Sequence, residues 1–404
     1  MRIFIYMFAL LAAVTPVSTW AEESGFAGAV GALSRGFLTQ QDQFGFGGGT
    51  DNYFARLRFQ DANGDIRSRL SFGFDHDDAT ILFDDSYLEY HRGLWAIGAG
   101  AKDRHWGPSR FTSLVLSDNT RPIPGLYLSR APARIDGPWL DWMGAVSGDI
   151  LVGQLAEHTA PAKTKLLGMR LGVNPAPGWE LELVRMVEFG GDGRDNSLGT
   201  FVKILSGLED ANSIVSNQIA GLGLSYQLPS LPLRGYFQAV GEDEAGYLPS
   251  CFFYLSGAEY ETHFAGRPAR FTLEAVDTRV SRTASGFCGP NTAYRNGQYA
   301  SGYSHYGATM GAPIDTEGTS ITLYGEHALR SVDLFWSFGH YDINRTSLAT
   351  HRLTPLRADG VLTAVGLSTM WFETTVSGVI AYQGFDLTEA ASGVSVGVQL
   401  HRSF

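Results

Sequence analysis

The sequence predicts an all-β protein, a transmembrane antiparallel β-barrel of about 18 strands with long extracellular loops. Three observations predict it: the composition, a period-two alternation of side chains, and a sorting of connections by length. The chain has 404 residues, of which 44% are hydrophobic and 18% charged, and its mean hydropathy is −0.05. This is low in charge for a soluble enzyme and too polar for a bundle of membrane helices. The 49 glycines and the 12% of aromatic residues are typical of barrels with tight bends and aromatic girdles.

The C-terminal residues show the alternation most strictly. Apolar side chains lie on one face of the expected strand and small or polar ones on the other, and the chain ends in Phe404. The apolar set is Val394, Val396, Val398, Leu400 and Phe404, and the polar set is Ser395, Gly397, Gln399, His401 and Ser403. A lipid-facing row and a lumen-facing row explain why the mean hydropathy lies near zero. Phe404 is the residue by which we expect the barrel assembly machinery to recognise the last strand.

The same alternation recurs along the chain in segments of about nine to twelve residues, the length of a tilted membrane strand. Two clear examples are 66–76, in which arginines oppose Ile and Phe, and 331–341, in which Trp336 and Phe338 lie on the apolar face. The expected strands are 26–38, 52–60, 66–76, 82–91, 94–102, 137–146, 149–156, 164–173, 179–188, 218–228, 232–241, 252–264, 268–281, 317–328, 331–341, 360–370, 372–384 and 393–404. Their number is even, as bacterial single-chain barrels require.

The connections between these strands alternate in length. Short turns lie at 61–65, 174–178, 228–232 and 329–330, and long loops at 103–136, 189–217, 282–316 and 342–359. With the C-terminus in the periplasm, every long loop falls on the extracellular side, as in outer-membrane barrels.

The first residues indicate export. Arg2, an apolar run from Ile3 to Val17, and the small residues Thr19 and Ala21 form a Sec signal peptide, 1–21, whose apolar run is too short for a spanning helix. We expect 22–404 to form a single barrel domain that reaches the bacterial outer membrane through the periplasm, in contact with outer-membrane lipid. The formal net charge of −11 excludes a basic nucleic-acid binder.

Two cysteines are too few for a disulfide framework, but Cys251 and Cys288 could form one bridge in an oxidising compartment. The histidines show no metal-binding spacing, and the chain has no GxSxG, HExxH or P-loop motif. We therefore expect no metal, no cofactor and no enzymatic activity.

The long loop at 103–136 carries the residues that suit a carbohydrate best. Aromatic faces stack on sugar rings, and planar amide and guanidinium groups make paired hydrogen bonds to hydroxyls or carboxylates. The candidate polysaccharide-binding residues are Arg104, His105, Trp106, Arg110, Asp118, Asn119 and Arg121. The alternative is a loop folded back into the barrel, where the same groups pair with lumen charges and form a plug.

A second candidate loop lies between the strands expected near 240 and 252. It contains Glu242, Asp243, Glu244 and Tyr247. Three consecutive carboxylates could bind Ca²⁺, or could form a solvated loop tip, which we favour because no spacing of oxygen ligands resembles an EF-hand.

Several of these segments resemble the Wzi-type outer-membrane capsule assembly proteins. The matching stretches are 105–108, 116–124, 241–250 and 288–294, in the same order, and the similarity runs from about residue 80 to the C-terminus. The resemblance implies an eighteen-stranded barrel that acts as a surface lectin and holds exported capsular polysaccharide at the cell face. It also places Arg104, Trp106, Asn119 and Arg121 in the family's most recognisable stretch.

The resemblance further implies a partner, and it reveals one expected difference from known members of the family. Known members carry a periplasmic helical bundle, which we expect to be absent here because few residues separate Ala21 from the first expected strand. A polysaccharide export channel is a further expected partner. The alternative function is a porin or specific diffusion channel, which an open, conducting lumen would distinguish from a lectin.

Overall fold

The structure of the chain is a computed structural model. It describes residues 25–38, 53–75, 80–135, 137, 140–156, 159–206, 216–245, 248–280 and 288–404. The expected signal peptide, 1–21, lies outside these described residues.

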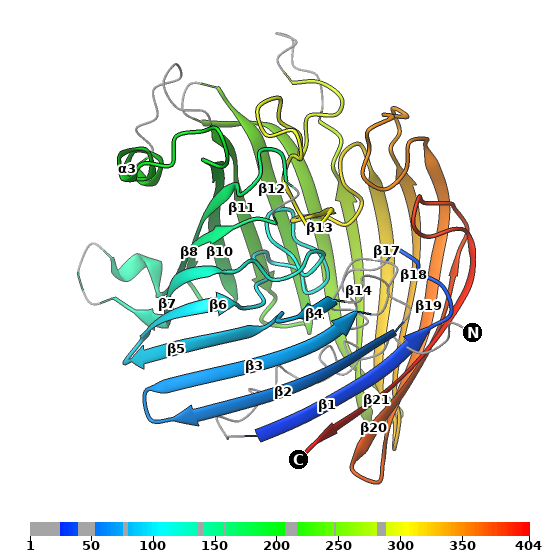
Figure 1. The fold of residues 1–404 in the computed structure, drawn as a ribbon. Coiled ribbons are helices and arrows are strands. Elements are labelled where there is room, and N and C mark those ends of the chain that lie inside the picture. Colours follow the sequence, from blue (N-terminus) through cyan, green and yellow to red (C-terminus); the bar gives the residue numbers. More distant parts are fainter. Residues whose placement is uncertain are drawn as a thin grey trace.

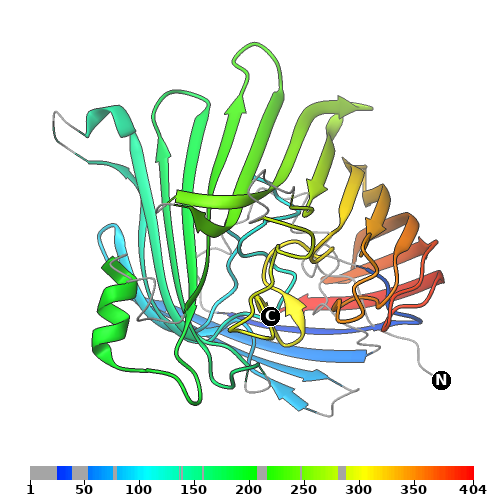
Figure 2. The same ribbon diagram turned by 90° about the horizontal axis from the view of Figure 1, so that it is seen from above.

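The described strands form one closed antiparallel barrel, drawn from the side in Figure 1 and from above in Figure 2. The barrel strands are β1 (Gly25–Leu33), β2 (Tyr53–Asn63), β3 (Ile66–Asp75), β4 (Thr80–Leu82), β5 (Ser86–Arg92), β6 (Trp95–Ala101), β7 (Gly125–Arg134), β8 (Ala145–Gln154), β9 (Lys165–Asn174), β10 (Trp179–Phe189), β11 (Ser216–Gln227), β12 (Leu233–Ala245), β13 (Leu248–Phe264), β14 (Arg267–Asp277), β17 (Thr319–Ala328), β18 (Asp333–Ile343), β19 (Ala358–Trp371), β20 (Thr374–Gln383) and β21 (Gly393–Ser403). Outside the barrel wall the structure has the 3₁₀ turn η1 (Asp141–Met143), the helix α3 (Leu198–Ser206) and the small hairpin β15 (Ser304–His305) and β16 (Ala308–Thr309).

Apart from β4 and β5, each barrel strand pairs with the next barrel strand along the chain, and β1 pairs with β21 to close the ring. The sheet has 19 labelled strands, and since β4 and β5 both pair with β3, they form one interrupted strand of an 18-stranded barrel. The predicted fold class and strand number are confirmed.

One expected strand is wrong. The structure has a strand at Gly125–Arg134 and a 3₁₀ turn at Asp141–Met143, where the sequence predicted a loop and a strand at 137–146. The reason is Pro132, which argues against a strand interior because it cannot donate a ladder hydrogen bond. The register of β7 against β8 shifts between Arg130 and Ala133, so the proline sits in an irregularity that tolerates it.

The two faces of the wall differ in chemistry. Large apolar side chains are exposed on the outer face, such as Ile97 at 58% and Ile380 at 59%. Charged pairs line the inner face, such as Arg170 with Glu182 and Asp149. This is the apolar-out, polar-in arrangement of a membrane-spanning barrel.

No helix among the described residues is long and apolar enough to cross a membrane.

The barrel closes next to Phe404. Its backbone N–H donates to the carbonyl of Phe26 at 2.8 Å, and the two rings stack with centroids 5.3 Å apart. Both ends of the described barrel therefore lie at the end with short turns. Recognition of Phe404 by the assembly machinery stays a prediction.

Candidate functional site

Loops from the opposite, long-loop end enter the lumen. The first loop is residues 102–124 between β6 and β7, the second loop is the described part, 288–318, of the connection between β14 and β17, and the third loop is 344–357 between β18 and β19. Figure 2 shows the first loop in cyan and the second in yellow inside the ring of strands.

Trp106 fixes the first loop to the barrel wall. Its side chain is 3% exposed and packs where a Cβ added to Gly168 of β9 would lie 2.9 Å from the indole. The carbonyl of Trp106 accepts hydrogen bonds from Ser113 and from Gln238 of β12. A side chain enclosed in this way packs the loop against the wall and does not present a face to a polysaccharide.

The tip of the first loop points toward the short-turn end. Arg110 lies 3.0 Å from the carboxylate of Glu326, near the end of β17, and Arg234 at the start of β12 donates to the carbonyl of Pro108 at 2.8 Å. Phe111 stacks on Tyr324 with centroids 3.9 Å apart. Arg110, expected at the cell surface, therefore lies deep in the lumen.

His105, Arg104 and Asp118 also make contacts inside the barrel. The ring of His105 lies 3.3 Å from Asp118 and 2.9 Å from the carbonyl of Ser109. Burial lowers the pKa of His105, but the hydrogen bond and charge of Asp118 outweigh it and raise the pKa above its ordinary value. The guanidinium of Arg104 lies 4.3 Å from the ring centroid of Tyr127, and burial lowers its pKa.

The returning limb of the first loop packs on the second loop. Asn119 is buried and donates to the carbonyl of Thr309 at 2.8 Å, and the Ser117 amide donates to Met310 at 2.8 Å. The hydroxyl of buried Tyr294 donates to the carbonyl of Leu114 at 2.9 Å. The first two loops thus form one packed body, which we call the plug.

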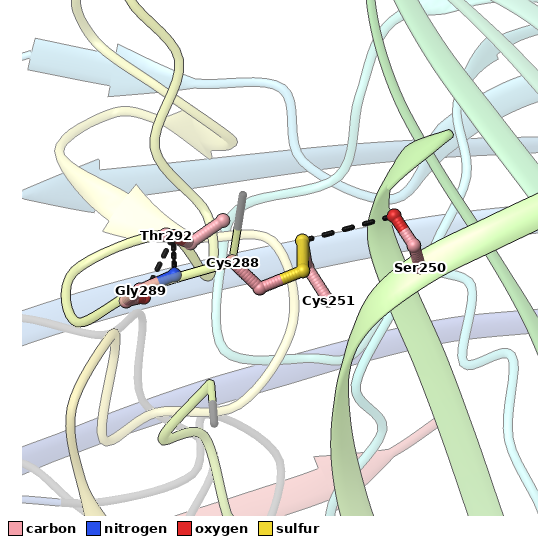
Figure 3. Close-up of a disulfide and its surroundings, with 5 residues drawn as sticks. All are labelled: Ser250, Cys251, Cys288, Gly289 and Thr292. Atoms are coloured by element: carbon pink, nitrogen blue, oxygen red, sulfur yellow. Dashed lines mark hydrogen bonds between the residues drawn. A yellow bond between two sulfur atoms is a disulfide. The ribbon is translucent and has the colours of Figure 1, made fainter. Parts of the chain in front are cut away.

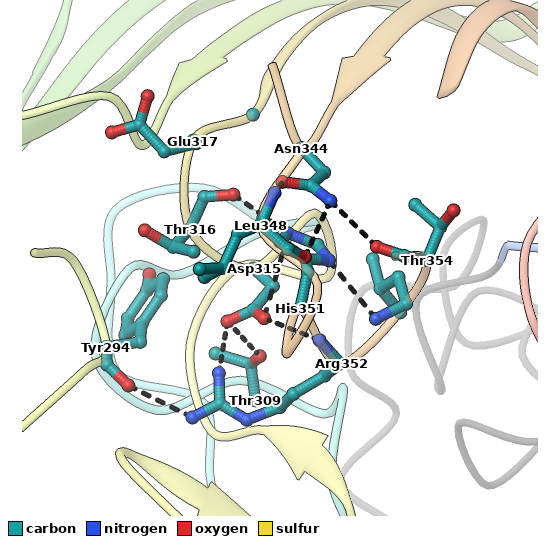
Figure 4. A network of polar contacts seen from close by, with 12 residues as sticks. Tyr294, Thr309, Asp315, Thr316, Glu317, Asn344, Leu348, His351, Arg352 and Thr354 are labelled. Atoms are coloured by element: carbon teal, nitrogen blue, oxygen red, sulfur yellow. Dashed lines mark hydrogen bonds and ion pairs between the residues drawn. The ribbon is translucent and has the colours of Figure 1, made fainter. Parts of the chain in front are cut away.

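Asp315 ties the plug to the third loop (Figure 4). Its side chain is fully buried and pairs with Arg352, lies 3.4 Å from Arg295 and 3.8 Å from His351, and accepts a hydrogen bond from Thr309 at 3.2 Å. Arg352 donates in addition to the carbonyls of the second loop at 294 and 301. Burial opposes ionisation of Asp315, but its cationic partners, Arg352 foremost, hold its pKa below the ordinary value.

A disulfide joins the second loop to the wall (Figure 3). Cys251 of β13 and Cys288 have Cα atoms 5.2 Å apart, so the structure contains the bridge that the sequence left open. Glu242 of β12 reinforces this attachment, because its carboxylate accepts the backbone N–H of Tyr294 at 2.9 Å.

The second candidate loop differs from the expectation. Glu242, Asp243 and Glu244 belong to β12, and the pairing with β13 continues to Ala245 and Leu248, so the segment is the end of a long hairpin. The side chains of Asp243 and Glu244 and all of Tyr247 lie outside the described residues.

Arg121 lies at the long-loop end of the plug. Its guanidinium donates to both carboxylate oxygens of Asp84, each at 2.9 Å, and its Cζ lies 4.0 Å from the ring centroid of Tyr306. Tyr306 is 47% exposed, whereas the side chains of Arg121 and Asp84 are 23% and 16% exposed. An aromatic ring beside a fixed fork of hydrogen-bonding groups is the combination that suits a sugar.

The turn between β15 and β16 presents this ring. Tyr306 and Gly307 have φ of 48° and 79°, as a two-residue hairpin turn of type I′ requires at both positions. Tyr306 and Asp84 are not among the site residues that the sequence predicted. The Tyr306-Gly307 pair, which is typical of a tight turn, is the sequence signal that could have indicated Tyr306. The residues around Asp84 contain no comparable signal.

Among the described residues, no group of three or more His, Cys, Asp or Glu side chains could hold a metal ion.

Comparisons with known proteins identify relatives of this chain. A family model described as capsule assembly protein Wzi matches residues 18–366, a longer stretch toward the N-terminus than the resemblance at about residue 80 suggested. An uncharacterised 55.8 kDa protein in the cps region of Klebsiella pneumoniae is 34% identical over 188 residues, which are 45% of this chain and 37% of that protein. The chain therefore matches little more than a third of that relative's length.

Solved structures share the fold. Wzi of Escherichia coli, an outer-membrane protein involved in group 1 capsule assembly and a carbohydrate-binding β-barrel, has a TM-score of 0.82 at 20% identity and covers 98% of this chain and 89% of its own. OccK5 of Pseudomonas aeruginosa has a TM-score of 0.52 at 7% identity over 95% of this chain and 97% of its own.

The Asp315→Asn substitution tests the attachment of the plug. The substitution removes the negative charge that faces Arg352 and Arg295. It leaves these buried cations without a counter-charge, which destabilises the packed plug by about 3–5 kcal/mol. We expect the plug to loosen while the barrel stays folded, measured as new planar-bilayer conductance and as tryptic cleavage after Arg295 or Arg352. Asp386→Asn, which changes an exposed loop carboxylate, should leave both unchanged. A silent, protease-resistant Asp315→Asn barrel would contradict this role.

Acidification should act at the same carboxylate. Because the folded pKa of Asp315 is depressed below its ordinary 3.8, its ionic stabilisation is complete above that value and is lost as the pH falls through the depressed pKa. Conductance should stay flat from about pH 7 to about pH 4 and rise only below, and Asp315→Asn should abolish this step. A step of the wild type between about pH 7 and 5 would show that another group controls the plug.

Proposed function

We propose, from the premise that the chain belongs to the Wzi capsule assembly family, that this outer-membrane barrel is a non-enzymatic lectin that holds capsular polysaccharide at the cell surface. The observation that carries the proposal is the group of Tyr306, Arg121 and Asp84 at the long-loop end of the plug. We call this group the surface triad.

The geometry of the surface triad supports sugar binding. Its ring, guanidinium and carboxylate come from three separate elements and are held by one another. A sugar ring can stack on the exposed part of Tyr306, while its hydroxyls exchange hydrogen bonds with Arg121 and Asp84. Pre-organised partners reduce the entropy cost of binding, which matters for a flexible polymer.

The charges of the triad favour one class of sugar. The bidentate pair of Arg121 with Asp84 neutralises both groups, and the chain as a whole carries −11. The negative charge of the protein would repel an acidic polymer. The positive charge of Arg121 is already compensated by Asp84, so it would attract such a polymer only weakly. We propose that the site recognises hydroxyl groups of neutral sugar residues, within a neutral or acidic capsule.

The plug counts against the alternative of a porin or diffusion channel. Its core side chains Trp106, Leu114, Tyr294 and Tyr303 are at most 3% exposed, so they fill the lumen as a packed interior. We retain two partners as proposals: the barrel assembly machinery, through the last strand and Phe404, and a polysaccharide export channel at the short-turn end.

The Tyr306→Ala substitution tests the lectin. It removes the stacking surface at an exposed position, so binding of the organism's own surface polysaccharide to the purified barrel should weaken by about five- to tenfold. Tyr306→Phe, which keeps the ring, should bind within about twofold of the wild type. Surface plasmon resonance on immobilised polysaccharide gives both values.

Tyr260→Ala is the matched control, because that ring is 45% exposed on the outer wall. Heat-modifiable gel mobility confirms that every variant is folded. Unchanged affinity of folded Tyr306→Ala would overturn the site, and absence of binding by the wild-type barrel would overturn the function.

A further inference from the structure

The outer wall of the barrel is hollowed between β7 and β12. The depression has a volume of about 820 Å³ and is lined almost entirely by apolar atoms, within the range of sites that hold small molecules, about 300–1,000 Å³. We call it the wall groove. It lies on the face of the sheet opposite the plug, so it belongs to neither the lumen nor the surface triad.

The register of the strands explains the hollow. One hydrogen-bonded row runs across the wall through Arg130, Gly148, Leu171, Leu183, Leu222 and Ala239. Small residues line the groove at Gly148, Ala220 and Ala239, whereas the leucines and Phe252 stand around it. Because these small side chains lie between large ones, they leave a hollow in the outer surface that larger side chains at the same positions would fill.

Helix α3 lies above the groove at the long-loop end. Its Phe201 and Ile204 pack on outward-facing Leu167, Val187 and Met169 of β9 and β10, and Met169 also lines the groove. The helix lies outside the ring of strands in Figure 2. It therefore covers the outer wall and not the lumen.

A second apolar face of α3 is only partly covered by the described residues. Leu198, Val202 and Leu205 follow the spacing of one helix face and are 75%, 52% and 41% exposed. This face adjoins the one that packs on the wall, so the apolar belt of the barrel continues without a break onto the helix.

Two outward-facing cations line the groove, Arg130 and Arg185, and both donate to protein oxygens. Arg130 donates to the carbonyl of Ala133 at 3.2 Å and to the carbonyl of Val146. Arg185 lines the groove, donates to the amide oxygen of Gln218 at 2.7 Å, and donates to the carbonyl of Ile204 at 2.8 Å, in the last turn of α3. A cation at a helix C-terminus is favourable, and its donors are occupied. The groove therefore offers hydrocarbon contact and not a polar ligand site.

We propose that the wall groove is a specific lipid site, in which an acyl chain of a phospholipid lies along the wall beneath α3. In a membrane the groove cannot hold water at low cost, and an unfilled hollow forfeits dispersion contacts along its lining. The continuity of the groove with the lipid-facing belt identifies acyl chains as the occupant. The helix retains the lipid by closing the groove at its upper end, which distinguishes this lipid from the rest of the belt.

Native mass spectrometry of the full barrel tests the site, with phosphatidylglycerol titrated into the delipidated, refolded protein in detergent. We expect one lipid to bind saturably. Ala220→Phe and Ala239→Phe fill the groove and should each weaken binding by roughly tenfold. Ala275→Phe, a lipid-facing position of β14 outside the groove, should bind as the wild type does.

Heat-modifiable gel mobility shows which variants are folded. Two groove variants are used so that the test still works if one of them does not fold. Equal lipid binding by all folded variants would overturn the proposal, because it would show belt lipid only. A wild-type dimer that Ala220→Phe dissociates would also overturn it, because the occupant would then be a second copy of the chain.

Discussion

The width of the barrel is the constraint on which the rest of the structure depends. In small barrels the strand side chains fill the interior, but 18 strands enclose a lumen too wide for that. Lumen-facing charges such as Glu326 and Glu274 must then be solvated or paired. Here the first loop pairs them, through Arg110 and through Ser109. The plug provides hydrogen-bond and charge partners for the lumen-facing side chains of the wall. Its buried rings, such as Trp106 and Tyr294, form an apolar core within the plug.

The barrel itself was predictable because its physics is local. Alternation along a strand such as β21 follows from lipid on one side and a polar lumen on the other, and it survives in the sequence without knowledge of any partner. The error at β7 has the same origin. Pro132 is a strong local signal for a loop, and only the register shift against β8 makes it compatible with a strand.

The arrangement of the site was less predictable because it depends on contacts between distant segments. Residue types in 104–121 predicted either a carbohydrate site or a plug, and both interpretations use the same hydrogen-bonding groups. The structure separates them by depth: Trp106, Arg110 and Asn119 make plug contacts, whereas Arg121 reaches the long-loop end. Asp84 lies between β4 and β5 and Tyr306 lies in the second loop, and both contact Arg121 of the first loop only in the folded barrel, so no spacing in the sequence identifies them.

We propose that the chain binds polysaccharide from outside, at the surface triad, and not within the barrel. Photo-crosslinking of polysaccharide fragments to the folded protein, with the attachment points mapped by mass spectrometry, tests this most directly. We expect adducts on the segments around Asp84, Arg121 and Tyr306. Adducts confined to the loop tip near Arg110, or to the recess of about 530 Å³ that Asn174, Glu180 and Arg234 line at the short-turn end, would contradict it.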